Sequence, residues 1–395
     1  MDSQNKNTCC AGKGWFVGVV VVVAVVIVGY FIFKSPSEPF ATEPVLNKPV
    51  SVAPIKIGVV GPLTGDMANI GENMRAAVEI ATEEINLAGG ISGRQLNIIY
   101  EDSKCVGKEG SSAVSKLINI DKVSAILGDT CSSSTLAQAP ISEKAKVVQL
   151  SYCSTAPDIT NAGDYIFRDV PSDLFQAKFA ANYIYNKLGK KKVAILFINN
   201  DWGNGIDKAF NDAFLAIGGQ IVNREGYDLA TKDLRSQLTK IKGLNPEVVY
   251  FAGFTDSTIA GLKQAKELGL KNIFFGADSW DDTKIWNDLG IAGNDAIFTV
   301  VGTASTDDFK AKMQAKLNKP DIIYCSNYAY DGLKVLAKGL SSVGGDATKL
   351  KDALYNINYT GGVSAETITF DKNGDPVTFN YIVKKVQDGK VEIVK

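Results

Sequence analysis

From residue 55 onward, short runs of apolar and β-branched residues alternate with longer segments that carry apolar residues at helical spacing. The first run, residues 55–61, predicts a strand, and residues 72–90 after it predict an amphipathic helix. The residues expected on its apolar face are Met74, Val78, Ala81 and Ile85. The glycine pair at 89–90 is expected to end this helix.

The remaining runs repeat this alternation along the chain. Further strands are predicted at residues 94–102, 123–129, 146–152, 191–199, 246–253, 272–278 and 295–301. Most of these runs are apolar throughout, which is typical of strands buried on both faces. Helical segments at 173–189, 233–243 and 256–269 separate several of them, so the pattern predicts βαβ units and doubly wound parallel sheets of the α/β class.

The number of strands exceeds what one compact sheet usually holds, so we predict two α/β lobes. Residues 167–173 are expected to cross between them. The predicted first lobe comprises residues 55–171 and 302–365, and the second comprises 172–301 and 366–395. The C-terminal segment from residue 366 predicts an antiparallel ribbon around the turn at 372–375.

The N-terminus has a different pattern. Residues 15–33 are uncharged and, as a helix, would span about 28 Å, enough to cross a membrane. A cleaved signal peptide is the alternative, but the apolar core is long and no small-residue cleavage site follows it. We therefore predict a cytoplasmic segment at 1–14, a transmembrane anchor at 15–33 and a proline-rich linker at 34–54. This places the lobes on the extracytoplasmic side of the cell membrane.

Composition narrows the function. The chain contains no histidine, which removes the usual base of serine and cysteine nucleophiles and the commonest metal ligand. An enzyme is therefore disfavoured, and we expect neither a metal nor a cofactor. The 42 basic and 43 acidic residues give a net charge of -1, and the basic residues form no stripe along the chain. We therefore do not expect the protein to bind nucleic acid.

Candidate binding residues follow the predicted strands, because loops at the carboxyl ends of parallel strands meet at one edge of a sheet. Hydroxyl residues at 132–135 and 154–155 follow two strands and could form an anion site with helix N-termini. Further candidates after other strands are Ile70, Trp202, Phe254 and Asp278.

Each candidate has a structural alternative. The hydroxyls of Ser132 and its neighbours could simply cap a helix, and Asp278 could cap the segment after it. Trp202 could belong to the core, and Phe254 and Ile70 are evenly balanced between core and pocket. A catalytic serine lacks both a histidine and a G-x-S-x-G turn, and residues 201–207 do not complete a dinucleotide-binding fingerprint.

The cysteines allow one disulfide at the same sheet edge. Cys105 and Cys131 each follow a predicted strand, and a bond between them would add about 3.5 kcal/mol of stability in the chain-entropy model. Two buried free thiols are the alternative. Cys153 and Cys325 are then expected to be unpaired or distant, and the pair at 9–10 to remain reduced in the cytosol.

Several segments together resemble the type I solute-binding proteins of ABC importers, in particular those for leucine, isoleucine and valine. The similarity extends from about residue 55 to 394. Its motifs are "IKIGVVGPLTGDMANIGENMRAAVEIATEEINLAGGISGRQL", "YEDSKC", "AILGDTCSSST", "STAPDIT", "YIFRDVPSD", "KKVAILFINNDWGNG" and "PEVVYFAG".

This resemblance implies two lobes joined by three hinge crossings, which close on a ligand. It implies that Ser132 and Thr155 bind an amino acid carboxylate together with N–H groups of their loops. Ser154, in the loop of Thr155, is counted among the ligand-binding residues. It further implies that Asp278 and the Cys153 carbonyl hold the ammonium. Positions matching Ile70, Trp202 and Phe254 would line the side-chain pocket, and Cys105–Cys131 would be the family's disulfide.

The chain also departs from the family pattern. Asp278 is one methylene shorter than the glutamate of well-known members, and Ile70 stands where some carry tryptophan. The expected function is capture of an amino acid with an aliphatic side chain and its delivery to an ABC permease. The alternatives are a ligand-sensing receptor domain and a binder of an amide, urea or small carboxylate.

Overall fold

The computed structural model describes residues 53–394 except residues 66 and 321. The predicted cytoplasmic segment, the predicted anchor at 15–33 and nearly all of the predicted linker therefore lie outside the described residues. Among the helices that are described, none is both long and apolar enough to cross a membrane.

The first lobe is built on a five-stranded sheet with the order β2-β1-β3-β4-β5, in which all neighbours are parallel. This agrees with the predicted doubly wound pattern. The strands are β1 (Ile55–Gly61), β2 (Leu96–Asp102), β3 (Ala125–Leu127), β4 (Gln149–Ser151) and β5 (Ile166–Arg168).

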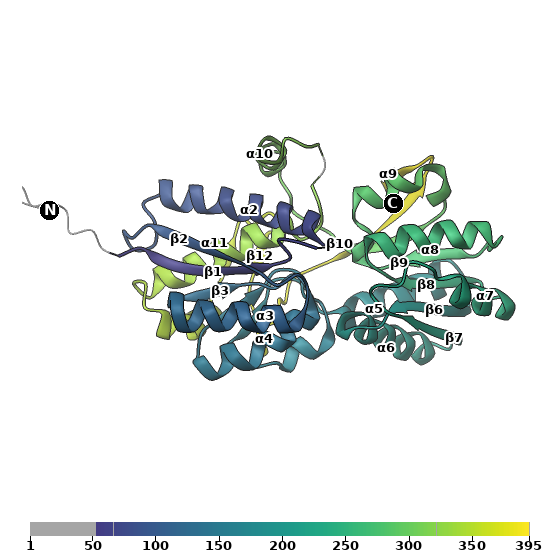
Figure 1. Cartoon of the computed structure of the whole chain (residues 1–395), viewed down its shortest axis with the longest axis horizontal. Helices are drawn as coiled ribbons and strands as arrows, with labels where there is room; N and C mark the ends of the chain where they lie inside the picture. Colours follow the sequence, from purple (N-terminus) through teal and green to yellow (C-terminus); the bar gives the residue numbers. More distant parts are fainter. Residues whose placement is uncertain (1–52, 66, 321, 395) are drawn as a thin grey trace, which may run out of the picture. The chain divides into compact units, whose positions relative to one another are not determined.

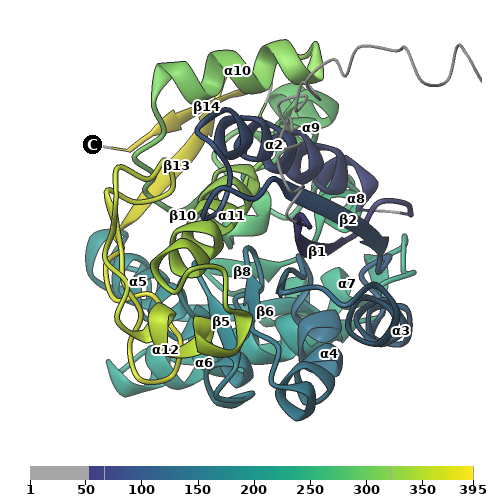
Figure 2. The same ribbon diagram turned by 90° about the vertical axis from the view of Figure 1, so that its left-hand side faces the viewer.

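Helices cover both faces of this sheet. Helices α2 (Ala68–Leu87) and α11 (Ser326–Ser342) lie on one side of β1, and α3 (Gly107–Lys116) and α4 (Ser132–Ala145) on the other (Figures 1 and 2). Alternate residues of β1 enter the two cores: Val59 packs with α2 and α11, and Val60 with α3. The apolar face predicted for the first helix is confirmed.

The second lobe is built on a seven-stranded sheet with the order β14-β13-β10-β9-β8-β6-β7. Its strands are β6 (Lys192–Ile198), β7 (Gln220–Tyr227), β8 (Val248–Ala252), β9 (Ile273–Gly276), β10 (Ile297–Val301), β13 (Tyr381–Gln387) and β14 (Lys390–Ile393). The strands from β7 to β10 are parallel, whereas β13 and β14 are antiparallel to their neighbours. This sheet is therefore mixed: its central strands have the predicted parallel arrangement, and the antiparallel ribbon predicted for the C-terminal segment adds to its edge.

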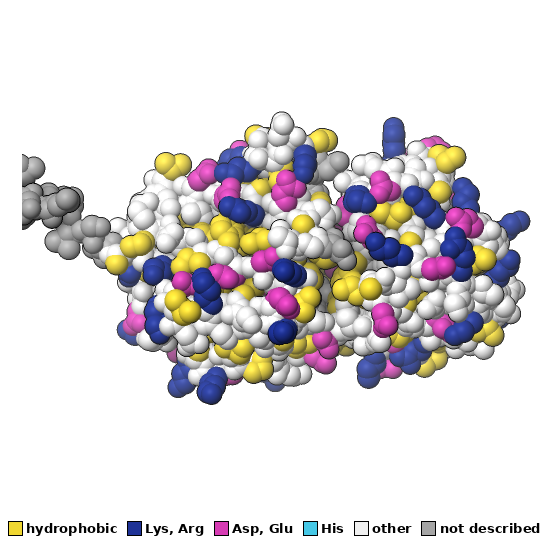
Figure 3. Space-filling view, in the orientation of Figure 1, with side chains coloured by type: hydrophobic (Ala, Val, Ile, Leu, Met, Phe, Trp, Pro, Cys, Tyr) yellow, Lys and Arg dark blue, Asp and Glu magenta, His cyan; other side chains and the backbone are white. Residues whose placement is uncertain are grey.

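A single large core of buried apolar residues joins this sheet to its helices. The helices are α5 (Asp173–Asn182), α6 (Asp201–Ala216), α7 (Arg235–Leu244), α8 (Thr255–Glu267) and α9 (Thr283–Leu289). Basic and acidic side chains are interspersed over the face of both lobes seen in Figure 3. The surface on that side is thus of mixed charge.

The shorter elements complete the two lobes. Helices α10 (Asp307–Leu317) and α12 (Leu350–Tyr355) and the small β11–β12 pair (Tyr359–Thr360 and Thr367–Ile368) follow β10 in the chain. Single helical turns occur at Leu117–Asp121, Pro157–Asn161, Tyr183–Lys187, Asp278–Trp280, Gly290–Gly293 and Ala347–Lys349.

The chain passes between the two sheets three times: between β5 and α5, between β10 and α10, and between β12 and β13. A buried ion pair joins the last residue of β5, directly before the first passage, to the third passage. Arg168 Nε donates to Asp375 Oδ1 over 2.6 Å, and its side chain is fully buried. Removing either partner would leave a buried charge without compensation, which costs about 3–5 kcal/mol in proteins.

The structure differs from the sequence prediction in the position of the C-terminal hairpin turn and in two strands, β5 and β7. The predicted turn at 372–375 is present and is closed by a single antiparallel bridge between Phe370 and Pro376, but the ribbon of β13 and β14 turns later, at residues 388–389. Strands β5 and β7 were not predicted. Strand β5 has only three residues, and β7 is mostly polar and lies at the edge of its sheet, so neither has the apolar run of a central strand.

Candidate functional site

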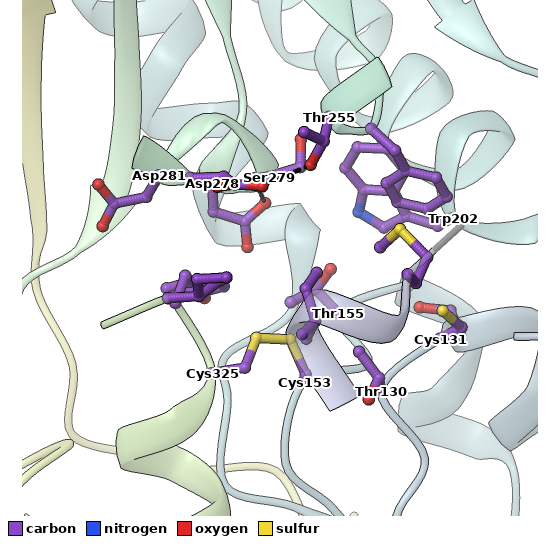
Figure 4. Close-up of a pocket in the computed structure, with 17 residues that line it drawn as sticks. Thr130, Cys131, Cys153, Thr155, Trp202, Thr255, Asp278, Ser279, Asp281 and Cys325 are labelled. Carbon is purple, nitrogen blue, oxygen red and sulfur yellow. Dashed lines mark hydrogen bonds between the residues drawn. A yellow bond between two sulfur atoms is a disulfide. The ribbon is translucent and has the colours of Figure 1, made fainter. Parts of the chain in front are cut away.

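A pocket of about 580 Å³, including its open mouth, lies between loops that follow strands of both sheets. Figure 4 shows Asp278, Ser279 and Thr255 of the second lobe on one side, and Thr130, Thr155 and the Cys153–Cys325 disulfide on the other. The lining residues are Met67, Ile70, Thr130, Cys131, Ser132, Cys153, Thr155, Trp202, Phe254, Thr255, Asp278, Ser279, Asp281, Asp282, Ile323, Tyr324 and Cys325. Every predicted binding residue except Ser154 is among them.

The loop between β3 and α4 is organised by the buried carboxyl group of Asp129. It accepts hydrogen bonds from the Thr130 amide (2.6 Å), the Ser134 hydroxyl (2.7 Å) and the Gln138 amide (2.8 Å). The predicted Cys105–Cys131 disulfide is present and holds the same loop. These contacts fix the position at which α4 begins.

The hydroxyl residues at the start of α4 do not cap it, contrary to one sequence interpretation. The N-cap position is Cys131, whose side chain makes no capping hydrogen bond. The hydroxyls instead connect loops: Ser132 Oγ accepts from the Ala156 amide (3.2 Å), and Thr135 Oγ1 lies 2.8 Å from Ser154 Oγ. Without a side-chain cap, the positive end of the α4 dipole faces the pocket at Cys131 and Ser132.

The loop after β4 lies beside this helix end and is held from behind by Arg168. The guanidinium donates to the carbonyl oxygens of Ala156 (2.9 Å) and Ser154 (3.4 Å). Ser154 is fully buried and bonds the Asp129 carbonyl (3.0 Å), so it supports the loop and does not line the pocket. Sequence reasoning missed the role of Arg168, because nothing local in the sequence shows what it contacts.

Asp278 is an acid of the pocket that has no cationic partner among the described residues. It is 4% exposed, and its Oδ1 accepts from the Ser279 amide over 2.9 Å. Asp281 is neutralised by Lys384 at 2.6 Å, and Asp282 accepts from Thr255 at 2.7 Å and caps α9. The capping role considered for Asp278 is thus filled by Asp282.

Burial raises the pKa of Asp278 from 3.8 to about 6, against the opposing effects of the Tyr324 hydroxyl and the Ser279 amide. A second buried acid, Asp173 at the start of α5, is close enough to Asp278 for their negative charges to repel each other. Burial and the charge of Asp278 raise the pKa of Asp173, while a hydrogen bond from Thr155 Oγ1 (2.9 Å) lowers it. A cation in the pocket would relieve this accumulation of negative charge.

One wall of the pocket is apolar. Trp202 and Phe254 stack with ring centroids 4.9 Å apart and planes inclined by 14°. Trp202 is only 5% exposed and also lines the pocket, so it serves both the core and the site. Met67, Ile70 and Ile323 add aliphatic surface.

Cys153 and Cys325 form a second disulfide, which corrects the prediction that they are unpaired or distant. Their Cα atoms are 5.5 Å apart across 172 residues of sequence. Both residues line the pocket, so the bond ties the loop after β4 to the start of α11 at the site itself. In the chain-entropy model a loop of this length stabilises the fold by about 5 kcal/mol.

The two lobes also contact each other beside the pocket. The Asp201 amide donates to Ser133 Oγ over 3.2 Å, and Asn69 Nδ2 donates to Asp282 Oδ2 over 3.3 Å. No group of three or more Cys, Asp or Glu residues suited to a metal ion occurs within the described part of the chain. The site therefore offers hydrogen-bond donors on one lobe, a carboxyl group on the other and an apolar wall between them.

A model of the periplasmic binding protein family matches residues 54–390. The chain belongs to the periplasmic binding protein family. A relative from Pseudomonas aeruginosa, described as a leucine-, isoleucine-, valine-, threonine- and alanine-binding protein, is 31% identical over 83% of this chain and 89% of its own length.

Two solved structures extend the comparison. A branched-chain amino acid transporter substrate-binding protein from Streptococcus pneumoniae, solved with isoleucine, has a TM-score of 0.78 and 26% identity over 86% of this chain and 99% of that one. A solute-binding protein of an ABC transporter from R. palustris, solved with 4-hydroxybenzoate, has a TM-score of 0.78 and 25% identity over 87% and 96%. The type I fold of this periplasmic binding protein is thus shared with relatives whose named ligands all carry a carboxylate.

Several residues of the site were not predicted from the sequence. Thr255 directly follows the predicted residue Phe254, and Ser279 directly follows Asp278. Thr130 lies in the same loop as Ser132. The strand-end rule could therefore have included all three. Ile323 and Tyr324 could not be found in that way, because they precede α11 and follow no strand.

The raised pKa of Asp278 predicts opposite pH dependences for stability and for binding of an ammonium ligand. Because the folded protein holds the proton more tightly than the unfolded chain, this group lowers stability as pH rises from about 4 to 6. An ammonium ligand requires the ionised form, so its affinity should be about tenfold weaker at pH 5 than at pH 7. Calorimetric titrations at several pH values measure this, and an affinity that is flat between pH 5 and 7 would contradict it.

Proposed function

We propose that this protein binds an α-amino acid with an apolar side chain in the pocket and delivers it to an ABC permease. The observation that carries the proposal is Asp278, a buried carboxyl group without a cation among the described residues, facing hydrogen-bond donors across the pocket. A zwitterion satisfies both sides at once, whereas a simple carboxylate or amine satisfies only one.

The carboxylate would bind at the start of α4. Ser132 Oγ accepts from the Ala156 amide, which leaves its own hydroxyl hydrogen free for a ligand. Thr155 already donates its hydroxyl to Asp173, so its contribution would come from its amide N–H. The uncapped end of α4 adds a favourable dipole for an anion.

The ligand's side chain would lie against the Trp202–Phe254 wall. This wall is uncharged and offers aliphatic neighbours in Ile70 and Ile323. Burying a branched aliphatic side chain there contributes about 1.5–3 kcal/mol. The named ligands of the Pseudomonas relative and the isoleucine in the Streptococcus structure agree with this choice.

An aromatic carboxylate is the second candidate. It is favoured by the Trp202–Phe254 stack and by the R. palustris structure with 4-hydroxybenzoate. In that case a protonated Asp278 would donate a hydrogen bond to the ligand's phenolic oxygen, and affinity would rise as pH falls through about 6. The pH profile described above therefore separates the two candidates.

Delivery requires capture without chemical change. The contacts Ser133–Asp201 and Asn69–Asp282 hold the lobes together around the pocket, and separation of the lobes at the three passages would release the ligand. We propose no catalytic step, because the matching family and the Pseudomonas relative are described as binding proteins. The ligand should be recovered unaltered.

We further propose that residues 15–33 anchor the protein in the cell membrane with its lobes outside, within reach of the permease. The uncharged 19-residue run supports this proposal. Full-length protein should stay with membranes after a carbonate wash, while a chain that begins at residue 53 should be released. Release of an uncleaved full-length chain would contradict the anchor.

The substitution Asp278→Asn tests the ammonium contact. It keeps the shape of the side chain but removes its charge, and should weaken L-leucine binding by about 2–5 kcal/mol, or roughly 30- to 4,000-fold. Asp281→Asn is the matched control, because Lys384 already neutralises that acid, and should change affinity less than about threefold. Equal affinities of Asp278→Asn and wild type in calorimetry would refute the assignment.

A further inference from the structure

The Tyr324 hydroxyl faces Asp278 in the pocket, and its oxygen accepts no hydrogen bond of standard geometry from any described residue. This oxygen is buried. It lies near enough to Asp278 to lower the pKa of that carboxyl. Since buried polar atoms in folded proteins nearly always have partners, an unpartnered hydroxyl that lines a ligand pocket points to a partner on the ligand.

The same pocket contains a second unpartnered acceptor. The Cys153 carbonyl accepts no hydrogen bond from any other described residue, and Cys153 lines the pocket. Together with the Asp278 carboxylate and the Tyr324 oxygen, this makes three acceptors. A primary ammonium has three N–H donors, whereas a secondary ammonium has two.

One covalent bond positions two of these three acceptors. The Cys153–Cys325 disulfide joins the residue that supplies the carbonyl to the residue directly after Tyr324. The ring of Tyr324 also packs edge-on against Tyr328, with centroids 5.8 Å apart. The carbonyl and the hydroxyl are therefore held relative to each other before any ligand arrives, which reduces the entropy lost on binding.

We propose that Tyr324 is a specificity-determining residue that completes, with Asp278 and the Cys153 carbonyl, a three-acceptor site for a primary ammonium. This inference rests on the proposed function and deepens it, because it selects primary α-amino acids over N-alkylated ones and over carboxylates without an amine. The Cys153–Cys325 disulfide acts as the positioning element of this site.

The test compares L-leucine with N-methyl-L-leucine, which keeps the charge but loses one N–H. Wild-type protein should prefer L-leucine by at least about tenfold. Tyr324→Phe should lose about tenfold or more in affinity for L-leucine and much less for the N-methyl ligand, so the preference should fall to within about threefold. Tyr328→Phe removes a neighbouring buried hydroxyl that does not line the pocket and should keep the preference.

The disulfides supply a second comparison. The double variant Cys153→Ala with Cys325→Ala should bind L-leucine more weakly and with a reduced preference over N-methyl-L-leucine. Cys105→Ala with Cys131→Ala loosens the carboxylate side only, so it should weaken both ligands equally and keep the preference. Circular dichroism and thermal unfolding establish that each variant is folded.

The outcomes separate this inference from the function on which it rests. A wild-type protein that binds neither ligand would overturn both the proposed function and the role of Tyr324. Wild-type protein that binds L-leucine, with an unchanged preference in folded Tyr324→Phe, would overturn the role of Tyr324 alone. The same loss of preference in Tyr328→Phe would also overturn it, because the effect would then not belong to the pocket hydroxyl.

Discussion

Burying an ionised carboxyl group without a cation is costly, and the site is arranged around one such group. Asp278 lies at the boundary between the lobes with no cation among the described residues, and its pKa is accordingly raised. Of its neighbours, Asp281 is neutralised by Lys384, and Asp282 accepts hydrogen bonds from Asn69, Thr255 and the Lys284 amide. In the proposed function, a ligand ammonium supplies the missing charge, which would couple occupation of the pocket to contact between the lobes.

The opposite side of the pocket depends on the geometry of parallel sheets. Loops after β3 and β4 meet at one sheet edge, and there Asp129 and Arg168 hold them from behind. The pocket hydroxyls therefore sit on a rigid base, while Asp278 belongs to the other lobe. Arg168 also binds Asp375 in the third passage, so the loop that would receive the carboxylate is linked to the chain along which the lobes would move.

Much of the fold and site could be predicted because both rest on local patterns. Apolar runs indicate the central strands, and the strand-end rule brought Ser132, Thr155 and Asp278 into one pocket. What could not be predicted depends on contacts between distant residues. Cys153 and Cys325 are 172 residues apart, Arg168 and Asp375 are 207 apart, and no local spacing relates either pair. The direction of β13 likewise follows from how the third passage enters the sheet.

The central claim is that the pocket recognises a zwitterion through both of its charges. Calorimetry with three matched ligands tests it most directly: L-leucine, 4-methylpentanoate, which lacks the amine, and 3-methylbutylamine, which lacks the carboxylate. The account predicts that L-leucine binds at least about a hundredfold more tightly than either analogue, because each leaves one side of the pocket unpaired. Binding of 4-methylpentanoate as tight as that of L-leucine at pH 7 would contradict it.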